Sequence, residues 1–457
     1  MGAPIEVPAL GPKGPYRSRN RLPISDVAGQ PIAELSLVPP LFVSRAMAAL
    51  HRAATPPTEE RLAALARAGE LFAAGTVAGL DADAYAHAVC RMSGTPLTGV
   101  RTAVESIRRS TALADRSAQA ARPVGAVRDW RAPEARTGTA VWVRRGAVFA
   151  VQAAGNHPAV HALWPEALAL GYRVAVRPSR REPLTPYRLV SALRAAGFGA
   201  DQVVLLPTDH RTADTLLREA DLGMVYGGQA VVDRYAADPT VLPAGPGRAK
   251  ILVTADSDWR SHLDVIADSV SRDGGVGCVD ATAVFVEGDP GPLAAALAER
   301  LATIADMPPE DERAILPVHP LAEARRLSDH LLARAAGTKA WLGGAGVVGD
   351  LGDGTATLRP AVHQLDGPYA EQAGTELPFP CVWVAPWTRE AGVEVLRNSL
   401  VLTAITEDEE LLDRLLAEPS ISNLHIGGHP THWMAPGVPH DAYLGEFLMR
   451  TKAVIRG

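Results

Sequence analysis

The chain is poor in cysteine and contains no long apolar run. Its 457 residues include only three cysteines, Cys90, Cys278 and Cys381, which lie far apart and form no CxxC pair. This spacing predicts neither a disulfide framework nor a structural zinc site, and it is typical of a reducing cytoplasm. No apolar run reaches the roughly 18 residues that span a bilayer, and residues 1–23 have no signal-peptide core. We therefore expect a soluble, cytoplasmic protein.

The chain also lacks an excess of positive charge. Its 45 Lys and Arg residues stand against 51 Asp and Glu, for a net charge of −6. Proteins that bind phosphate backbones as their main task are usually basic, so we expect no nucleic-acid partner. At this length, with 47% hydrophobic residues, the chain can form two or three domains with cores of their own.

Strand and helix patterns alternate through most of the chain. The first forty or so residues are rich in proline, which favours irregular structure, and helix patterns then cover 41–51, 57–74 and 81–114. Strand patterns follow at 140–143, 147–152, 173–176, 202–206, 251–254 and 281–287, with helix patterns at 159–170, 186–196, 259–270 and 292–304. This alternation predicts right-handed βαβ crossovers in two α/β domains with parallel sheets. A β-like segment at 447–455 is the kind of terminal strand that often pairs with a partner subunit.

Two further motifs suggest ligands but lack the context that a ligand site needs. Residues 344–349 match GxGxxG, yet a turn-rich stretch follows instead of the helix N-terminus that cradles a phosphate. Four histidines, His425, His429, His432 and His440, lie in a segment interrupted by glycine and proline. Zinc ligands usually stand on regular elements, so we expect these histidines to make hydrogen bonds, and we predict no metal site.

Cys278 differs from the other two cysteines in its surroundings. It ends the glycine-rich stretch 273–278 between a predicted helix and a predicted strand, where small neighbours let a substrate approach. Cys90 and Cys381 lie in apolar helix and strand patterns and are expected in the core. From spacing alone Cys278 fits a nucleophile and a buried thiol equally well, because reactivity depends on the environment.

Five motifs, taken in order and spacing, resemble the aldehyde dehydrogenase superfamily. They are 146–158 with Asn156, 174–186 with Arg177 and Ser179, Tyr226-Gly227-Gly228, Cys278, and Glu376-Leu-Pro-Phe-Pro380. The resemblance covers nearly the whole chain. It implies an α/β fold with two Rossmann-like domains, one for the cofactor and one for catalysis, and a small β oligomerisation segment.

The resemblance also implies domain boundaries and an oligomer. Residues 1–124 would be a helical N-terminal part of the cofactor domain, 125–145 the β oligomerisation segment, and 146–250 the nicotinamide dinucleotide-binding domain. Residues 251–430 would form the catalytic domain, and 431–457 a C-terminal return with an oligomerisation strand. A homodimer or homotetramer is expected.

The resemblance assigns roles to individual residues. Cys278 would be the nucleophile, and the Asn156 amide with the Cys278 backbone N–H would hold an oxyanion. Glu376 would hold the nicotinamide ribose. The cofactor-binding set also includes Arg177, Ser179, Arg180, Gly227, Gly228 and Phe379. An arginine at position 180 suits a 2′-phosphate, so NADP(H) is the preferred cofactor, with NAD(H) also possible.

One departure from the superfamily pattern bears on the reaction. Hydrolytic members carry a Glu about 34 residues before the Cys, and here that place falls near Ala244, followed by Gly245-Pro246-Gly247. This pattern resembles the acylating branch, which exchanges acyl groups with coenzyme A. Hydrolysis of an acyl-enzyme needs a positioned base, whereas exchange with a thiol needs much less help.

Three hypotheses follow for the activity. The first is NAD(P)H-dependent reduction of an activated acyl group to an aldehyde, or the reverse, through a Cys278 acyl-enzyme. The acyl group could arrive on coenzyme A, on a carrier protein or as an adenylate. The second is ordinary oxidation of an aldehyde to an acid. The third is a catalytically silent member that acts as a binding subunit, because His157 and the Val279-Asp280 pair also depart from the pattern.

Overall fold

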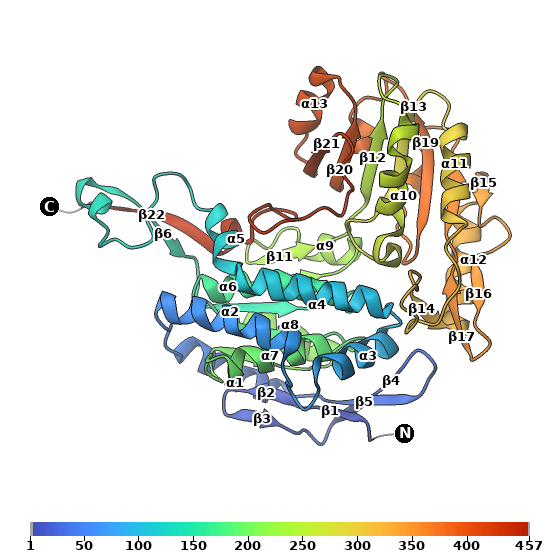
Figure 1. The fold of residues 1–457 in the computed structure, drawn as a ribbon. Helices are drawn as coiled ribbons and strands as arrows, with labels where there is room; N and C mark the ends of the chain where they lie inside the picture. Colours follow the sequence, from blue (N-terminus) through green and yellow to red (C-terminus); the bar gives the residue numbers. More distant parts are fainter. Residues whose placement is uncertain (1–2, 456–457) are drawn as a thin grey trace.

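The protein is described by a computed structural model that covers residues 3–455, with the side chains at 136, 137 and 210 left aside. Two seven-stranded sheets, each packed between helices, form its two main parts, and a two-stranded arm projects from one of them (Figure 1). This is the expected α/β fold with two Rossmann-like sheets. The outer residues of the predicted first and last domains, 1–2 and 456–457, lie outside the described range.

The expectation of an irregular N-terminal part is wrong. Five short strands precede the first helix: β1 (Ile5–Val7), β2 (Ala9–Gly11), β3 (Gly14–Tyr16), β4 (Arg21–Ser25) and β5 (Pro31–Ser36). Strands β1, β5 and β4 form a small sheet. Strands β2 and β3 extend the larger sheet of the segment 146–250 beyond β9; we call it the cofactor sheet, after the role that the resemblance implies for this segment. Proline is tolerated here because edge strands and strand ends do not need every backbone N–H. The segment 1–124 is therefore not purely helical.

Helices cover both faces of the cofactor sheet. The N-terminal ones are α1 (Pro40–Arg52), α2 (Thr58–Ala74), α3 (Ala82–Ser93), α4 (Leu97–Ala112) and α5 (Ala114–Ala120). The single helix pattern at 81–114 is broken because Gly94 adopts a left-handed conformation with φ of 75°. Helices α2 and α4 pack closely at Gly69, where a Cβ would lie 2.7 Å from the Arg108 carbonyl oxygen. This close contact fixes the helical layer over the sheet.

The cofactor sheet has the order β11-β10-β7-β8-β9-β2-β3. Its parallel strands are β7 (Val148–Gln152), β8 (Arg173–Arg177), β9 (Val203–Leu205), β10 (Leu222–Tyr226) and β11 (Val241–Ala244). The intervening helices are α6 (Pro165–Ala169), α7 (Leu184–Ala195), α8 (His210–Arg218) and α9 (Gln229–Tyr235). The helix expected at 159–170 is interrupted, because a 3-10 turn, η2 (Pro158–Ala162), precedes α6 and Pro165 starts the helix. The strand order reverses between β7 and β10, which is where doubly wound sheets bind ligands.

The second large sheet, which we call the catalytic sheet after the role that the resemblance implies for it, has the order β15-β18-β19-β13-β12-β20-β21. Its strands are β12 (Ala249–Val253), β13 (Ala281–Glu287), β15 (Lys339–Leu342), β18 (Ala361–Gln364), β19 (Cys381–Trp387), β20 (Ser399–Ile405) and β21 (Ile421–Ile426). Helices α10 (Leu263–Ser271), α11 (Gly291–Leu301), α12 (Leu321–Arg334) and α13 (Glu409–Leu416) accompany it, with short turns η3 (Trp259–His262), η4 (Arg272–Gly275), η5 (Glu371–Gly374) and η6 (Glu394–Leu396). A small sheet, β14 (Val318–Pro320), β17 (Thr355–Leu358) and β16 (Val348–Asp350), lies beside α12. The sheet is buried on both faces by two separate apolar clusters.

The projecting arm is a pair of strands far apart in sequence. Strand β6 (Thr139–Arg144), after the turn η1 (Pro133–Thr137), pairs antiparallel with β22 (Met449–Val454), which follows α14 (Leu444–Leu448). The expected terminal strand is therefore present, and within this chain its partner is β6. The arm extends away from both sheets (Figure 1).

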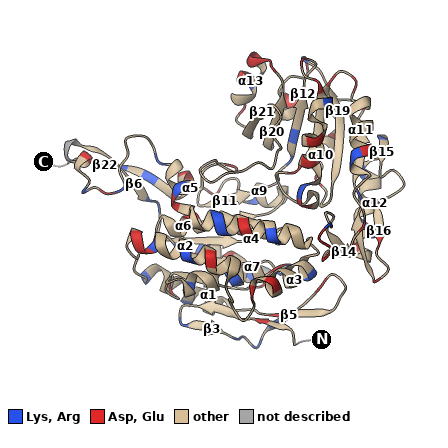
Figure 2. Ribbon diagram, in the orientation of Figure 1, with Lys and Arg blue, Asp and Glu red and all other residues tan. Residues whose placement is uncertain are grey.

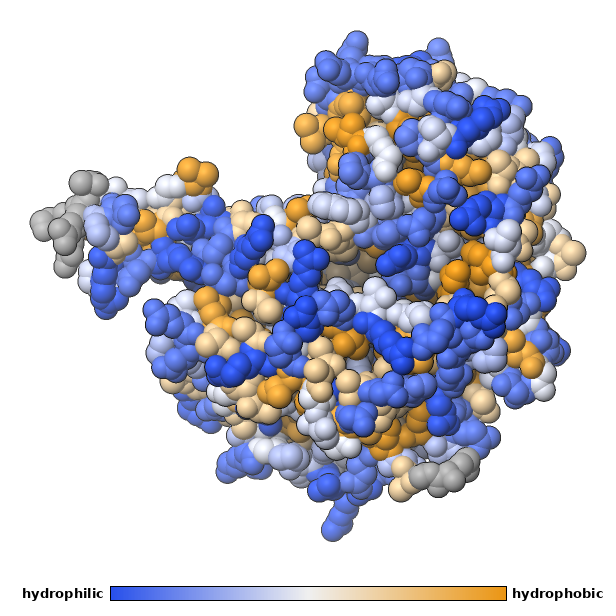
Figure 3. Space-filling model, viewed as in Figure 1, coloured by the Kyte–Doolittle hydropathy of each residue, from blue (hydrophilic) through white to orange (hydrophobic). Residues whose placement is uncertain are grey.

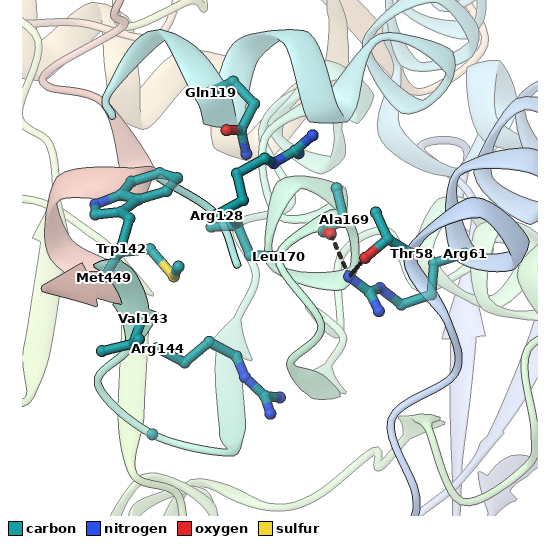
Figure 4. Close-up of a pocket in the computed structure, with 11 residues that line it drawn as sticks. Thr58, Arg61, Gln119, Arg128, Trp142, Val143, Arg144, Ala169, Leu170 and Met449 are labelled. Carbon is teal, nitrogen blue, oxygen red and sulfur yellow. Dashed lines mark hydrogen bonds between the residues drawn. The ribbon is translucent and has the colours of Figure 1, made fainter. Parts of the chain in front are cut away.

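A cavity of about 440 Å³ lies at the base of the arm (Figure 4). Arg61 from α2, Arg128 and Arg144 line it together with Trp142 and Met449 of the two arm strands. Arg61 donates to the Ala169 carbonyl at 3.1 Å, so part of this positive charge is bound to backbone oxygens. Burial lowers the pKa of Arg61 and of Arg144. The cavity belongs to the arm and not to the cysteine site described below.

Charged side chains of both signs are spread over the helices and loops of both parts (Figure 2). The face seen in Figure 3 is mostly hydrophilic, with separate apolar patches. Within residues 3–455, the structure contains no helix that is both long and apolar enough to cross a bilayer.

Candidate active site

Cys278 lies on a tight turn between η4 and β13. The Gly277 backbone N–H donates to the Asp280 carboxylate at 2.7 Å, and this bond closes the turn around the cysteine. Asp280 is 3% exposed, and burial raises the pKa of its carboxyl well above the usual value. Cys278 itself is half-buried and packs beside Leu400 and Val401. Asp280, which departs from the family pattern, therefore stabilises the turn that carries the Cys278 thiol.

The sequence motifs meet around this turn. The Asn156 side-chain amide, which follows β7, donates to the Val276 carbonyl at 3.2 Å. Gly247 approaches so closely that a Cβ there would overlap the Cys278 carbonyl oxygen. Gly275 packs in the same way on Pro380 at the end of the Glu376 motif. Segments more than a hundred residues apart are therefore brought to one place, as the resemblance implied.

The glycines of the 226–228 motif lie on the cofactor side of the same region. Gly227 directly follows β10, and its carbonyl oxygen lies 2.5 Å from where a Cβ on Gly245 would stand. Gly228 precedes α9 and is exposed, and a Cβ added there would meet no atom within 4 Å. The Tyr226 hydroxyl donates to the Val160 carbonyl at 3.0 Å. The motif therefore links β10 to the loop that covers Cys278.

Glu376 and Phe379 stand on the catalytic side. The Glu376 carboxylate accepts a hydrogen bond from the Arg248 backbone N–H at 2.7 Å, which ties its motif to the start of β12. Phe379 is buried, so it supports the segment from within the core. In this structure both residues hold the site together, and their roles toward a cofactor stay predictions.

Two arginines, Arg177 and Arg180, lie near each other at the end of β8. Neither forms an ion pair with a carboxylate among the described residues. The Arg177 guanidinium is buried and donates to the Thr208 hydroxyl at 3.0 Å. Burial, together with the charge of Arg180, lowers the pKa of Arg177. The Arg180 Nε is buried and has no hydrogen-bond partner among the described residues. Ser179 accepts from the Arg181 backbone N–H and packs on Gly155, where a Cβ would collide with its hydroxyl. An unpartnered guanidinium N–H beside a second cation fits an anionic group such as a nucleotide phosphate.

His440 is the main residue that the sequence reasoning missed. Its Nε2 lies 3.5 Å from Cys278 Sγ, and its Nδ1 lies 3.3 Å from the Asp441 carboxylate. Burial alone would lower the pKa of His440, but the neighbouring Cys278 and Asp441 outweigh that effect and hold the pKa well above its usual value. The sequence placed His440 only in a histidine-rich loop, and that signal did not point to the cysteine.

The other candidates lie where the sequence predicted. His425 bonds to the Pro430 carbonyl and His432 to the Asp268 carboxylate, so these histidines do make hydrogen bonds. Residues 344–349 form a turn that enters β16, and the helix that a dinucleotide motif requires does not follow. Cys90 and Cys381 are buried, and burial raises the pKa of both thiols, that of Cys90 to about 12.

Glu166 is a second group that the sequence did not single out. It lies on α6, is 9% exposed, and burial raises the pKa of its carboxyl to about 8. Its charge acts on Tyr226, as do those of Cys278 and Asp441. A carboxyl of this kind holds its proton at neutral pH.

The comparisons with known proteins agree with this geometry. The aldehyde dehydrogenase family model matches residues 24–427, and the chain belongs to the aldehyde dehydrogenase family. It is thus an oxidoreductase of that family. A comparison with curated protein sequences returns no match.

Solved structures of the family share the fold at low sequence identity. The gamma-glutamyl-gamma-aminobutyraldehyde dehydrogenase of Burkholderia cenocepacia J2315 is 19% identical, with a TM-score of 0.81 over 99% of this chain and 96% of that one. An indole-3-acetaldehyde dehydrogenase of P. syringae, in complex with NAD+ and IAA, is 15% identical, with a TM-score of 0.83 over 99% and 97%. An NAD-dependent aldehyde dehydrogenase from Sinorhizobium meliloti is 17% identical, with a TM-score of 0.81 over 99% and 95%. The names of these three proteins indicate aldehyde dehydrogenases and not the acylating branch.

Proposed function

We propose that this protein interconverts an activated acyl group and its aldehyde through an acyl-enzyme on Cys278. The acyl group would be a thioester of coenzyme A or of a carrier protein, and a nicotinamide cofactor would supply or accept the hydride. The natural direction would be reduction to the aldehyde or its reverse.

The loop 245–247 carries this proposal. It lies against the Cys278 backbone, and Ala244 before it brings no carboxylate to the position where hydrolytic relatives have a base. Water is a poor nucleophile toward a thioester without a base, whereas a thiol reacts with much less help. A site built this way favours exchange of the acyl group between thiols over its hydrolysis.

Asn156 is suited to hold the oxygen of the acyl group. A side-chain amide has two N–H donors, and one of them is on the Val276 carbonyl. The other remains for a substrate oxygen, with the Cys278 backbone N–H as a second donor. Removing a donor of this kind typically slows a reaction by about a hundredfold or more.

For the cofactor we propose NADP(H) in preference to NAD(H). Arg177 and Arg180 would attract the 2′-phosphate, with Ser179 beside them. Gly227 and Gly228 would allow close approach of the dinucleotide, and Glu376 and Phe379 would complete the site on the nicotinamide side. We further propose a cytoplasmic homodimer or homotetramer assembled through the arm.

Aldehyde oxidation to an acid is the second candidate, and His440 favours it. An imidazole 3.5 Å from the Cys278 sulfur can take a proton from water as well as from a thiol. Under this alternative His440 replaces the missing carboxylate as the base for hydrolysis.

Intact-mass measurement after incubation with a panel of acyl-coenzyme A thioesters, without cofactor, tests the proposal. We expect an acyl adduct on the wild type that NADPH then discharges as aldehyde, and no adduct on Cys278→Ala. The variant should retain cofactor binding, because Cys278 does not contribute to the arginine pair. Cofactor-dependent oxidation of free aldehydes without any thioester adduct would instead establish the second candidate.

A further inference from the structure

His440 is held in place from several sides. Its backbone carbonyl accepts a hydrogen bond from the Asn423 amide on β21, and the same amide donates to the Leu400 carbonyl at 2.9 Å. The Tyr443 hydroxyl donates to the Gly437 carbonyl at 3.0 Å and closes the loop that carries His440. A loop tied to the edge of the catalytic sheet can therefore present an imidazole in a defined orientation.

The two ring nitrogens of His440 face different partners. Nε2 is directed at Cys278 Sγ and Nδ1 at the Asp441 carboxylate, at 3.5 Å and 3.3 Å. A carboxylate on one ring nitrogen fixes the ring and stabilises its protonated form, so that the opposite nitrogen can exchange a proton with a nucleophile. Tyr226, Glu166 and Asp280 are other titratable groups near this pair.

We propose that His440, oriented by Asp441, is the acid–base residue of the Cys278 site and keeps Cys278 ready as a thiolate. This inference deepens the proposed function and depends on it for the identity of the acyl donor. His440 touches the reacting sulfur and is the catalytic residue of the pair, while Asp441 acts through it as a positioning residue.

The proton balance of the acyl transfer follows from this pair. In the proposed starting state Cys278 has given its proton to His440 Nε2, which lies 3.5 Å from the sulfur. The thiolate attacks the acyl carbon of the thioester, and the bond from that carbon to the substrate sulfur breaks, with its electron pair going to the sulfur. His440 Nε2–H gives its proton to this departing sulfur, which leaves a free thiol, a neutral imidazole and an acyl-Cys278 thioester.

The same residues complete the cycle. The hydride that reduces the acyl-enzyme to the aldehyde would come from a nicotinamide cofactor when one is bound. Cys278 then leaves as a thiolate, and His440 recovers a proton from solvent, so that one thioester, one hydride and one proton give one aldehyde and one thiol. In the opposite direction neutral His440 would take the proton from an incoming thiol.

The pH dependence of Cys278 alkylation by iodoacetamide tests this pair without any substrate or cofactor. A free thiol ionises near about pH 8.5, so an unassisted Cys278 would react slowly at neutral pH. For the wild type we expect the rate to reach half its maximum below neutrality. In His440→Gln the midpoint should rise by more than about one pH unit, and the rate near pH 6.5 should fall by about tenfold or more.

Two further variants make the test specific. His429→Gln, in the same loop, removes a histidine that has no bond to Cys278 in the structure and should leave the alkylation profile unchanged. Asp441→Asn keeps the imidazole and should shift the midpoint in the same direction as His440→Gln but by less. Alkylation is read at Cys278 by peptide mass, since Cys90 and Cys381 are buried, and circular dichroism verifies that each variant is folded.

The outcomes separate this inference from the proposed function. An unchanged alkylation profile in folded His440→Gln overturns the inference, even if acyl thioesters still form an adduct on Cys278. A shifted profile in a protein that accepts no acyl thioester supports the inference and rejects the proposed function.

Discussion

The three cysteines of this chain have the same side chain but lie in two kinds of environment. Cys90 and Cys381 are enclosed by apolar neighbours, and burial raises the pKa of each thiol. Cys278 is half-buried, sits on a turn closed by Asp280, and touches an imidazole. The glycine-rich local sequence of Cys278 indicates access for a substrate but not reactivity, because the contact with the imidazole comes from a residue 162 positions away. At this scale the environment and not the residue type determines the chemistry.

The charge at position 180 gives a prediction on cofactor choice. Arg180→Glu replaces a cation that would face the 2′-phosphate with an anion that repels it and can accept from a ribose hydroxyl. We expect kcat/KM to shift from NADP(H) toward NAD(H) by about tenfold or more, in line with the strength of one charge-assisted contact. Steady-state kinetics with both cofactors measure the ratio. Arg181→Glu, at the next position, is the matched control, and an equal shift in both variants would contradict a specific role for Arg180.

The buried carboxyl of Glu166 predicts a pH dependence of stability. Its pKa is raised to about 8 in the folded protein, whereas an exposed Glu ionises near about 4.3. Between these pH values the folded chain retains a proton that the unfolded chain has released, so the free energy of unfolding falls as the pH rises. Glu166→Gln has no such proton, so this dependence on pH should be absent from the variant. The part of the free energy of unfolding that Glu166 makes pH-dependent is at most on the order of 5 kcal/mol.

Urea unfolding of the wild type and of Glu166→Gln at several pH values tests this prediction. The variant should gain stability relative to the wild type as the pH rises toward about 8, where the folded Glu166 begins to ionise. A difference between the two proteins that does not vary with pH would show that Glu166 is ionised in the fold.

At the scale of elements, a single glycine separates α3 from α4 and joins the two halves of the molecule. Gly94 has φ of 75°, and its carbonyl accepts from the Val318 backbone N–H at 2.8 Å, so the helix end contacts β14 of the catalytic part. A Cβ at this position would overlap the Val318 carbonyl oxygen. Both the conformation and the close contact therefore require glycine.

Gly94→Ala is expected to destabilise the protein more than the conformation alone explains. A left-handed alanine costs about 1 kcal/mol, and the collision with Val318 should raise the loss to about 3 kcal/mol or more. Gly79 is the matched control, because its φ is 82° and a Cβ there would meet nothing within 4 Å. Gly79→Ala should thus lose only the conformational part. Equal losses in the free energy of unfolding would show that Val318 moves aside at no cost.

Some elements could be predicted from the sequence and others could not, for physical reasons. The strands β7, β8, β12 and β13 are mostly apolar segments, and the strand–helix alternation around them indicates a parallel sheet. Strands β1 to β3 have three residues each, too few for a period to show, and β2 is a strand because it pairs with β9. The break before Pro165 and the break at Gly94 depend on single residues that an averaged helix pattern does not register.

For the whole molecule, the arm predicts self-association. Strand β22 pairs with β6 on one side, and the pair extends from the body, where an unpaired strand edge is a template for another chain. Light scattering coupled to size-exclusion chromatography should give a multiple of the 48.1 kDa chain mass. A particle of one chain mass at micromolar concentration would contradict this role of the arm.

Membership of the aldehyde dehydrogenase family is carried by motifs spread along the chain, and their order and spacing can be recognised in the sequence alone. The candidate site is recoverable only in part. Asn156, Cys278 and Glu376 belong to such motifs, but His440, Asp441 and Glu166 matter through contacts that folding creates. A single sequence does not show which distant residues are in contact in the folded protein.

The C-terminal segment joins two properties that are usually treated separately. Over a short stretch the chain runs from His440, beside the Cys278 thiol, through α14 and into β22 of the arm. A C-terminal fusion, a proteolytic cut or a neighbouring subunit that shifts β22 would act on the same stretch of backbone that positions the imidazole. If the arm assembles the protein as proposed, we expect the reactivity of Cys278 to change when the position of β22 changes.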